Sequence, residues 1–225
     1  MDLQQYVAAV DAFMPQITAA GVKVLSPWLL GEDDSEHARA LLASYMNPPP
    51  GARILDAGSG TGELARLMHA LRPDLIFTLL NPSALQLHMG PAHMDKLCAP
   101  FEAIPAPNES FEVVLFSQSI EHALDVPAVL REAARVLAPG GQVFIFGLRH
   151  VSGPREHMTK LVWSTPLTRE EMMAAAWSAG LRCDMACEPA AVPMCVPGVL
   201  DAEQHAHIFG GVRPYIWKFR KDHGV

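Results

Sequence analysis

The chain has 225 residues, of which 50% are apolar and 18% are charged, and its formal net charge is −7. A disordered chain is excluded, because disorder goes with low hydrophobicity and high net charge, and the lack of clustered Lys and Arg disfavours a nucleic-acid partner. The sequence has neither an apolar run near the roughly 20 residues of a membrane span nor a secretory signal pattern at its start. We therefore expect a cytoplasmic protein without a membrane span.

Three consecutive prolines, Pro48–Pro50, mark the strongest boundary, because each one removes a backbone donor and stops a preceding helix. Upstream, apolar residues recur at helical spacings over 2–20 and 34–46. We expect residues 1–47 to form a helical lid or cap, or residues 2–20 to form a dimer contact. Residues 48–225 are predicted to form the core.

Downstream of the prolines, short apolar runs alternate with helical patterns. The predicted elements are, in chain order, strand 53–56, helix 63–71, strand 75–80, helix 84–89, strand 113–116, helix 127–137, strand 143–146, helix 168–179 and two final strands at 181–185 and 215–219. Thr168 and Glu171 form a capping-box pattern, and Gly180 suits the end of that helix. This alternation predicts an α/β fold with a mostly parallel sheet between helices, whose ligands bind beyond the carboxyl ends of the strands.

A glycine loop follows the first predicted strand, with Gly58, Gly60 and Gly62 at alternate positions and Asp56 just before them. Glycine allows a sharp turn and a close approach of backbone to a ligand. The spacing is neither that of a dinucleotide-binding loop nor that of a P-loop, and no lysine follows. A carboxylate at Asp56 would repel a pyrophosphate and suit a cationic ligand.

The loop resembles motif I of class I S-adenosylmethionine (SAM)-dependent methyltransferases. Four further segments resemble that family in the same order, namely Leu80–Leu87, Ile104–Val114, Ser119–Asp125 and Arg131–Gly141. The resemblance runs from about Ala52 to Gly147 and looks like the methyltransferase type 11 group. It implies a Rossmann-like, mostly parallel seven-stranded sheet, SAM as cofactor with S-adenosylhomocysteine as product, and a monomer or homodimer.

By this resemblance, Asp56 orients the ammonium group of SAM, and Gly58 and Gly60 lie against its amino-acid part. The expected cofactor-binding residues are Asp56, Gly58, Ser59, Gly60, Asn81, Pro82, Phe101, Ser117 and Gln118.

Two positions depart from the family pattern. Asn81 stands where relatives carry an Asp or Glu that accepts both ribose hydroxyls. An amide offers fewer acceptors and loses charge-assisted hydrogen bonds, so Asn81 either binds the ribose more weakly or only caps the following turn. Pro100 stands where the usual Asp reaches the adenine, which leaves Phe101 either as a wall of the adenine site or as ordinary core.

Methyl transfer from an activated sulfonium mainly requires alignment and exclusion of water, and a base is needed only if the nucleophile must lose a proton. His122 and Glu121 follow the fourth strand of the family and are the candidate catalytic residues, although they could instead cap the next helix. His150, beside Arg149, could bind an anionic substrate group or simply face solvent.

The candidate walls of the substrate pocket are Trp28 and Trp163, which could equally be ordinary packing. An apolar, proline-containing stretch at about 186–212 is expected to cover the substrate. His205 and His207, with Cys187 and Cys195, do not complete a standard tetrahedral set, so no metal is expected.

The sequence thus predicts a SAM-dependent methyltransferase that acts on a small, fairly apolar metabolite. The spacing of Asn81, Ser83 and Gln86 is similar to that in relatives that methylate small metabolites, several of them at alkene or other carbon centres, which leans toward carbon. Two alternatives stay open, namely a SAM-binding cyclase or decarboxylase, and a non-catalytic interaction domain. The intact glycine loop weighs against the second.

Overall fold

The computed structural model describes residues 2–5, 7–8, 11–12, 38–150, 167–187 and 212–222, with backbone alone for 148–150 and 212–214. Its elements from residue 41 onward are η2 (Leu41–Met46), β1 (Arg53–Ala57), α3 (Glu63–Leu71), β2 (Ile76–Leu80), α4 (Ala84–Met89), β3 (Asp95–Leu97), β4 (Phe111–Ser117), η3 (Ile120–His122), α5 (Val126–Val136), β5 (Leu137–His150), α6 (Arg169–Ser178), β6 (Leu181–Cys187) and β7 (Val212–Lys221). Shorter helical pieces lie within residues 3–12. None of the described helices has both the length and the apolar composition that crossing a bilayer requires.

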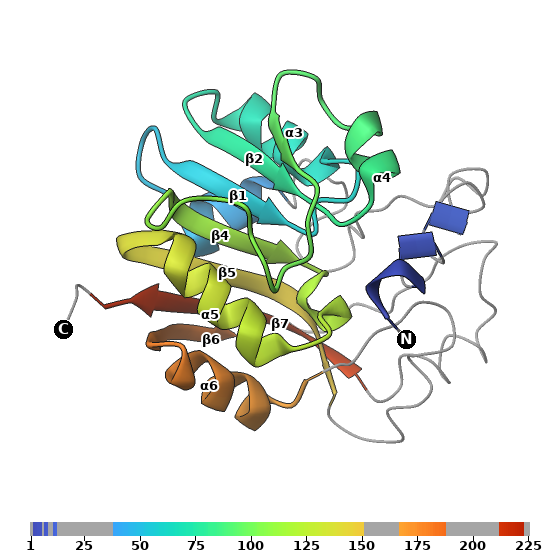
Figure 1. The fold of residues 1–225 in the computed structure, drawn as a ribbon. Coiled ribbons are helices and arrows are strands. Elements are labelled where there is room, and N and C mark those ends of the chain that lie inside the picture. Colours follow the sequence, from blue (N-terminus) through green and yellow to red (C-terminus); the bar gives the residue numbers. More distant parts are fainter. Residues whose placement is uncertain are drawn as a thin grey trace, which may run out of the picture.

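The seven strands form one sheet in the order β3-β2-β1-β4-β5-β7-β6 (Figure 1). The strands from β3 to β5 pair in parallel, whereas β7 pairs antiparallel with both β5 and β6. The prediction of a mostly parallel seven-stranded α/β sheet is confirmed. Because the chain runs outward in both directions from β1 and β4, the carboxyl ends of these two central strands frame a crevice at the switch point.

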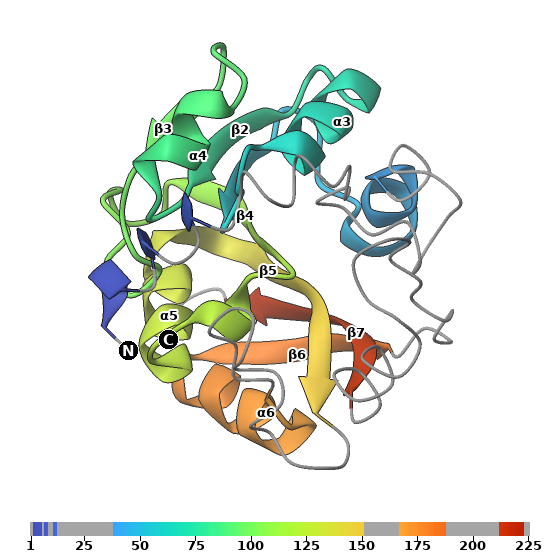
Figure 2. The same cartoon turned by 90° about the vertical axis from the view of Figure 1, so that its right-hand side faces the viewer.

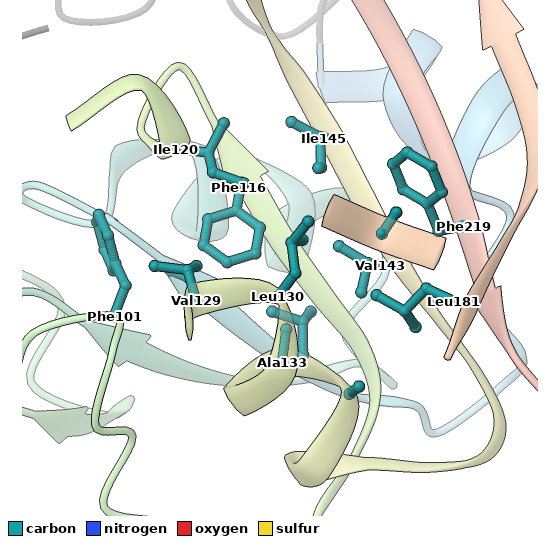
Figure 3. Close-up of a cluster of buried hydrophobic side chains, with 14 of the residues drawn as sticks. Phe101, Phe116, Ile120, Val129, Leu130, Ala133, Val143, Ile145, Leu181 and Phe219 are labelled. Carbon is teal, nitrogen blue, oxygen red and sulfur yellow. The ribbon is translucent and has the colours of Figure 1, made fainter. Parts of the chain in front are cut away.

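Apolar side chains fill both faces of this sheet. On one face, α5 and α6 cover alternate residues of β1, β4, β5 and β7, and Figure 3 shows Phe116, Leu130 and Ile145 within this cluster. On the other face, η2 and α3 pack against the opposite residues of the same strands, including Ile54, Leu115 and Phe144. Both faces of the central strands are therefore buried, as expected for a parallel sheet.

Local sequence patterns predicted most of the helices and strands that the structure contains. Helix α3 and helix α4 have the predicted bounds, and Thr168 and Glu171 form the predicted capping box of α6. Gly180 adopts a left-handed conformation with φ of 74° directly after that helix. The described part of the predicted helix 34–46 becomes a π-helix from Leu41 and ends at Asn47, just before the prolines.

Strands β3 and β5 differ most from the prediction. Strand β3 was not predicted, because its three residues, Asp95–Leu97, are too few and too polar to give an apolar run. Charged residues are common on such edge strands, where they oppose pairing with another chain. Strand β5 begins at Leu137 instead of residue 143, because Pro139–Gly141 join it through a shift in register against β4.

Arg135, at the end of α5, fastens the loop before β4. Its guanidinium donates to the carbonyl oxygens of Ile104 and Ala106, to Asn108 Oδ1 and to the carboxylate of Glu132 at 2.8 to 3.0 Å. Arg135 also lowers the pKa of Glu132 through this hydrogen bonding. The family-like segment Arg131–Gly141 therefore has a structural role at this position.

We expect Arg135→Ala to lower the free energy of unfolding by about 1–2 kcal/mol, because the loop carbonyls lose their donors at a site that solvent partly screens. Arg135→Lys should recover only part of this loss, since an ammonium cannot reproduce the planar fork. Urea unfolding of both variants measures the effect, and equal stability of Arg135→Ala and the parent protein would refute it.

Candidate functional site

The glycine loop lines a cavity of about 150 Å³ at the carboxyl ends of β1 and β4. Its lining residues are Asp56, Gly58, Ser59, Gly60, Thr61, Glu63, Leu64, Ser117 and Gln118. Six of the nine predicted cofactor residues are among them. The cavity opens at the crevice where a parallel sheet of this topology binds its ligands.

Two glycines of the loop are required for different reasons. A Cβ on Gly58 would lie 2.3 Å from Ser119 Cβ and 3.1 Å from Phe101 Cζ, so β1 and the β4 loop pack there without room for a side chain. Gly60 has a φ of 56°, but the one described atom that a Cβ on it would meet within 4 Å is Gln86 Oε1, at 3.6 Å. Gly58 thus serves packing, whereas Gly60 leaves space beside the cavity.

Asp56 is the main charged group of the cavity. Its side chain is 2% exposed, and its Oδ2 has no hydrogen-bond partner among the residues that the structure describes. Burial without a counter-charge raises the pKa of Asp56 to about 7. Such a carboxylate fits a ligand that brings its own cation.

Two hydroxyls that line the same cavity as Asp56 are also buried without a hydrogen-bond partner among the described residues. Ser59 Oγ and Ser117 Oγ are buried and have no partner within the described part of the chain. Buried polar groups in folded proteins are normally hydrogen-bonded. A carboxylate and two hydroxyls that all lack partners among the described residues therefore indicate a cavity built for a polar, cationic ligand.

The second strand ends in a buried network of amides. Asn81 Nδ2 donates to Gln86 Oε1 at 2.6 Å and to the carbonyl oxygen of Gly60 at 3.3 Å, and Asn81 Oδ1 accepts from Ser83 N at 3.3 Å. Asn81 thus caps its turn and also touches the glycine loop. Pro82, which follows it, is half-buried.

Phe101 lies mainly in the hydrophobic core. Its ring is 6% exposed and packs edge-on against Phe116, with 5.8 Å between the centroids. The same ring lies under Gly58, and Phe101 is absent from the cavity lining. The structure thus places this side chain below the glycine loop.

The loop after β4 turns sharply to form the other wall of the cavity. Gln118 has a φ of 51°, and its N–H donates to the carbonyl oxygen of Phe146 at 2.6 Å. Ser119 Oγ donates to the carbonyl oxygen of Ala57 at 2.6 Å. These bonds fasten β4 to β5 and β1, so that Ser117 and Gln118 face the glycine loop.

Glu121 and His122 follow within η3. Glu121 is 5% exposed, whereas His122 is half-buried. A Cβ on Gly147 would lie 2.1 Å from Glu121 Oε1 and 3.0 Å from Tyr215 Oη, so the carboxylate and the phenol meet over the bare backbone of β5. Burial, and then the charge of Glu121, raises the pKa of Tyr215.

Sequence reasoning missed Tyr215, Gly147, Ser83 and Gln86 as parts of this region. Gln86 and Ser83 had a signal in their spacing, but it suggested the attacked atom rather than the shape of the site. Tyr215 had none, because it lies on β7, opposite Gly147 in the sheet register. Only strand pairing brings it to Glu121.

Several predicted positions lie outside the described residues. These are Trp28, Trp163, Cys195, His205 and His207. His150 is the last residue of β5, and its side chain is not described. Among the described residues, no three His, Cys, Asp or Glu side chains gather as a metal site would require.

The central part of the chain is similar in sequence to known methyltransferases. Residues 55–145 match the family described as a methyltransferase domain. The chain is 35% identical over 99 residues to the ubiquinone/menaquinone biosynthesis C-methyltransferase UbiE of Rubrivivax gelatinosus, covering 42% of this chain and 39% of that protein. It is 34% identical over 108 residues to a ubiquinone biosynthesis O-methyltransferase of a Bradyrhizobium species, covering 46% and 42%.

The matched region thus spans about two fifths of the length of these relatives. Among solved structures, the [4+2]-cyclase SpnF is similar with a TM-score of 0.80 and 18% identity, covering 100% of this chain and 98% of that one. At this identity the likeness shows the fold alone.

Proposed function

We propose that the chain, whose residues 55–145 match a methyltransferase domain, is a class I SAM-dependent methyltransferase that transfers a methyl group from SAM to a small, fairly apolar molecule. The observation that carries this proposal is the buried Asp56 carboxylate, which lacks a partner among the described residues and faces a cavity under a bare glycine loop. A SAM molecule carries both an ammonium group and a sulfonium, so it would supply the missing positive charge.

In this proposal, different residues around the cavity bind different parts of the cofactor. Asp56 accepts the ammonium group, and Ser59 and Gly60 border the amino-acid part. Asn81 and Pro82 lie on the ribose side, where Asn81 would act through neutral hydrogen bonds, and Phe101 supports the glycine loop from below. Ser117 and Gln118 close the opposite wall.

The bound cofactor supplies an activated methyl group, and the protein aligns the acceptor and excludes water. Where the acceptor carries a proton, we propose that Glu121 receives it, with His122 as the second candidate. The support for Glu121 is its burial and its place over Gly147, next to the phenol of Tyr215.

A carbon centre is the attacked atom that we favour. The spacing of Asn81, Ser83 and Gln86 supports it, and UbiE of Rubrivivax gelatinosus is named a C-methyltransferase. The Bradyrhizobium relative is named an O-methyltransferase, so oxygen is the alternative that the assay must separate. The acidic net charge supports a small molecule over RNA as acceptor.

The same fold also supports a second candidate, because SpnF, with a TM-score of 0.80, is named a cyclase. We further propose that residues 1–47 and about 186–212 cover the substrate, and that the protein is a monomer or a homodimer. The described part of the first segment contributes Leu41, Leu42 and Met46 to the core under the sheet.

Calorimetry with SAM, followed by mass spectrometry of a panel of quinol, phenol and prenyl acceptors, tests the proposal. Micromolar binding and a product heavier by one methylene group are expected. Binding with turnover of an acceptor at unchanged mass would favour the cyclase candidate, and no binding would overturn both in favour of an interaction domain. A carbon-bound methyl signal in the product separates carbon from oxygen.

Glu121→Gln should lower kcat by about 100-fold or more, because the amide keeps the shape of the side chain but cannot accept a proton. Gly147→Ala should lower kcat by about tenfold, since its Cβ would displace the Glu121 carboxylate from a backbone that alanine tolerates. In both variants the Kd for SAM should stay within twofold. Full activity in Gly147→Ala would show that the position of Glu121 does not matter.

A further inference from the structure

Asp11, which lies in the described part of the N-terminal segment (residues 2–5, 7–8 and 11–12), is hydrogen-bonded to a residue next to the cofactor region. Ser83 Oγ donates to Asp11 Oδ1 at 2.5 Å, across 72 positions of sequence. A hydrogen bond from a hydroxyl to an ionised carboxylate is about twice as strong as a neutral one. In Figures 1 and 2 the dark blue pieces of residues 3–12 lie beyond the carboxyl ends of the parallel strands.

The Oγ of Ser83 makes a second hydrogen bond. It is the N-cap of α4, and its Oγ accepts from Gln86 N at 3.1 Å. A hydroxyl has one proton to donate, and here that proton goes to Asp11. The side chain of Ser83 is thus held from both sides, and it is 1% exposed.

From Ser83 the polar contacts continue to the glycine loop. Gln86 lies in the first turn of α4, where its N–H donates to Ser83 Oγ, and its Oε1 accepts from Asn81 Nδ2 at 2.6 Å. Asn81 Nδ2 also donates to the carbonyl oxygen of Gly60. Both amides are buried, at 5% and 6% exposure. A chain of four contacts therefore connects Asp11 to a wall of the cavity.

Buried networks of this kind depend on every member, because a donor or acceptor that loses its partner in a dry site costs free energy. Without Asp11, the Ser83 hydroxyl must turn to another acceptor, and its bond to Gln86 N weakens. The amides of Gln86 and Asn81 then lose their fixed orientation beside Gly60.

We propose that Asp11 is a positioning residue of the cofactor site, through which docking of the N-terminal segment and binding of SAM favour one another. Asp11 acts through Ser83, Gln86 and Asn81 and does not touch the cofactor itself. The inference rests on the proposed location of the cofactor. By linkage, whatever factor Asp11 docking adds to the affinity for SAM, bound SAM adds to docking.

Calorimetry with two probes, S-adenosylhomocysteine and 5′-methylthioadenosine, tests this placement. Asp11→Ala should weaken both probes by 5- to 10-fold, because both carry the ribose that lies nearest to the network. Asp56→Asn should weaken only S-adenosylhomocysteine, since the other probe lacks the amino-acid part. Ser83→Ala combined with Asp11→Ala should bind no more weakly than Ser83→Ala alone, because both act through one hydroxyl.

Asp2→Asn is the matched control. Asp2 lies in the same segment, but within the described part of the chain its Oδ1 accepts from the nearby Gln5 N and from no residue of the cofactor region, so this variant should bind both probes as the parent does. Limited proteolysis gives a second readout, in which S-adenosylhomocysteine should slow cleavage before residue 38 in the parent protein but not in Asp11→Ala. Affinity within twofold of the parent, or equal protection in Asp11→Ala, overturns the inference. A parent protein that binds neither probe overturns the proposed function as well.

Discussion

Asp56→Asn is expected to raise the Kd for SAM by at least 100-fold while making the ligand-free protein more stable at pH 8. The loss of affinity follows because the amide cannot pair with an ammonium group in a site where Asp56 is 2% exposed. The gain in stability follows because the parent protein buries a carboxylate that has no partner among the described residues. Calorimetry and urea unfolding measure the two effects.

The sign of the pH dependence follows from the raised pKa of about 7 for Asp56. Between about pH 4 and pH 7 the folded protein keeps a proton that the unfolded chain has released, so stability falls as the pH rises. Three pKa units correspond to roughly 4 kcal/mol, and the unpaired amide of the variant offsets part of this. We therefore expect Asp56→Asn to be about 2 kcal/mol more stable at pH 8, with the advantage disappearing near pH 5.

Binding of SAM should show the opposite trend in the parent protein. Below pH 7 Asp56 must release its proton before it can pair with a cation, so affinity should rise with pH and level off above pH 7. Asp95→Asn, which changes an exposed carboxylate on the edge strand, is the control and should behave like the parent. Tight, pH-independent binding by Asp56→Asn would mean that the ammonium group sits elsewhere.

Gly60→Val should abolish measurable SAM binding and leave the protein folded. The first atom of the new side chain meets no described atom closer than 3.6 Å, so the sheet can form, but its methyl groups would occupy the cavity. The left-handed φ of 56° adds a strain of about 1–2 kcal/mol or more for a branched side chain. Circular dichroism and calorimetry on the same sample separate folding from binding.

Gly58→Ala is the informative comparison. Its Cβ would lie 2.3 Å from Ser119 Cβ at a φ of 82°, so β1 and the β4 loop would have to separate. We expect a loss of at least 3 kcal/mol in the free energy of unfolding, from a single methyl group. If Gly60→Val unfolds the protein as severely, the separation of packing and binding roles between the two glycines is wrong.

The sequence alone predicted those features that depend on residues close together in the chain. The predicted bounds of α3 and of α4 were both confirmed. The cavity around Asp56, Gly58 and Gly60 also lies where the loop predicted it. The ligand contacts of these residues stay predictions until binding is measured.

Features that depend on contacts between distant segments could not be predicted from the sequence. Strand β3 exists because β2 offers it an edge, and its own three residues have no strand pattern. The side chain of Phe101 was open between core and adenine wall, and packing against Phe116 places the ring in the core.

The sequence by itself determined the order of the strands and helices other than β3, the family resemblance and the glycine loop with its carboxylate, because each depends on neighbours within a few residues. Tertiary structure alone decided that Asp56 has no partner among the described residues, that Tyr215 meets Glu121 over Gly147 and that Asp11 reaches Ser83. The reason is physical. Burial and strand pairing join segments separated by dozens of residues, and the free energy of a buried charge depends on everything packed around it.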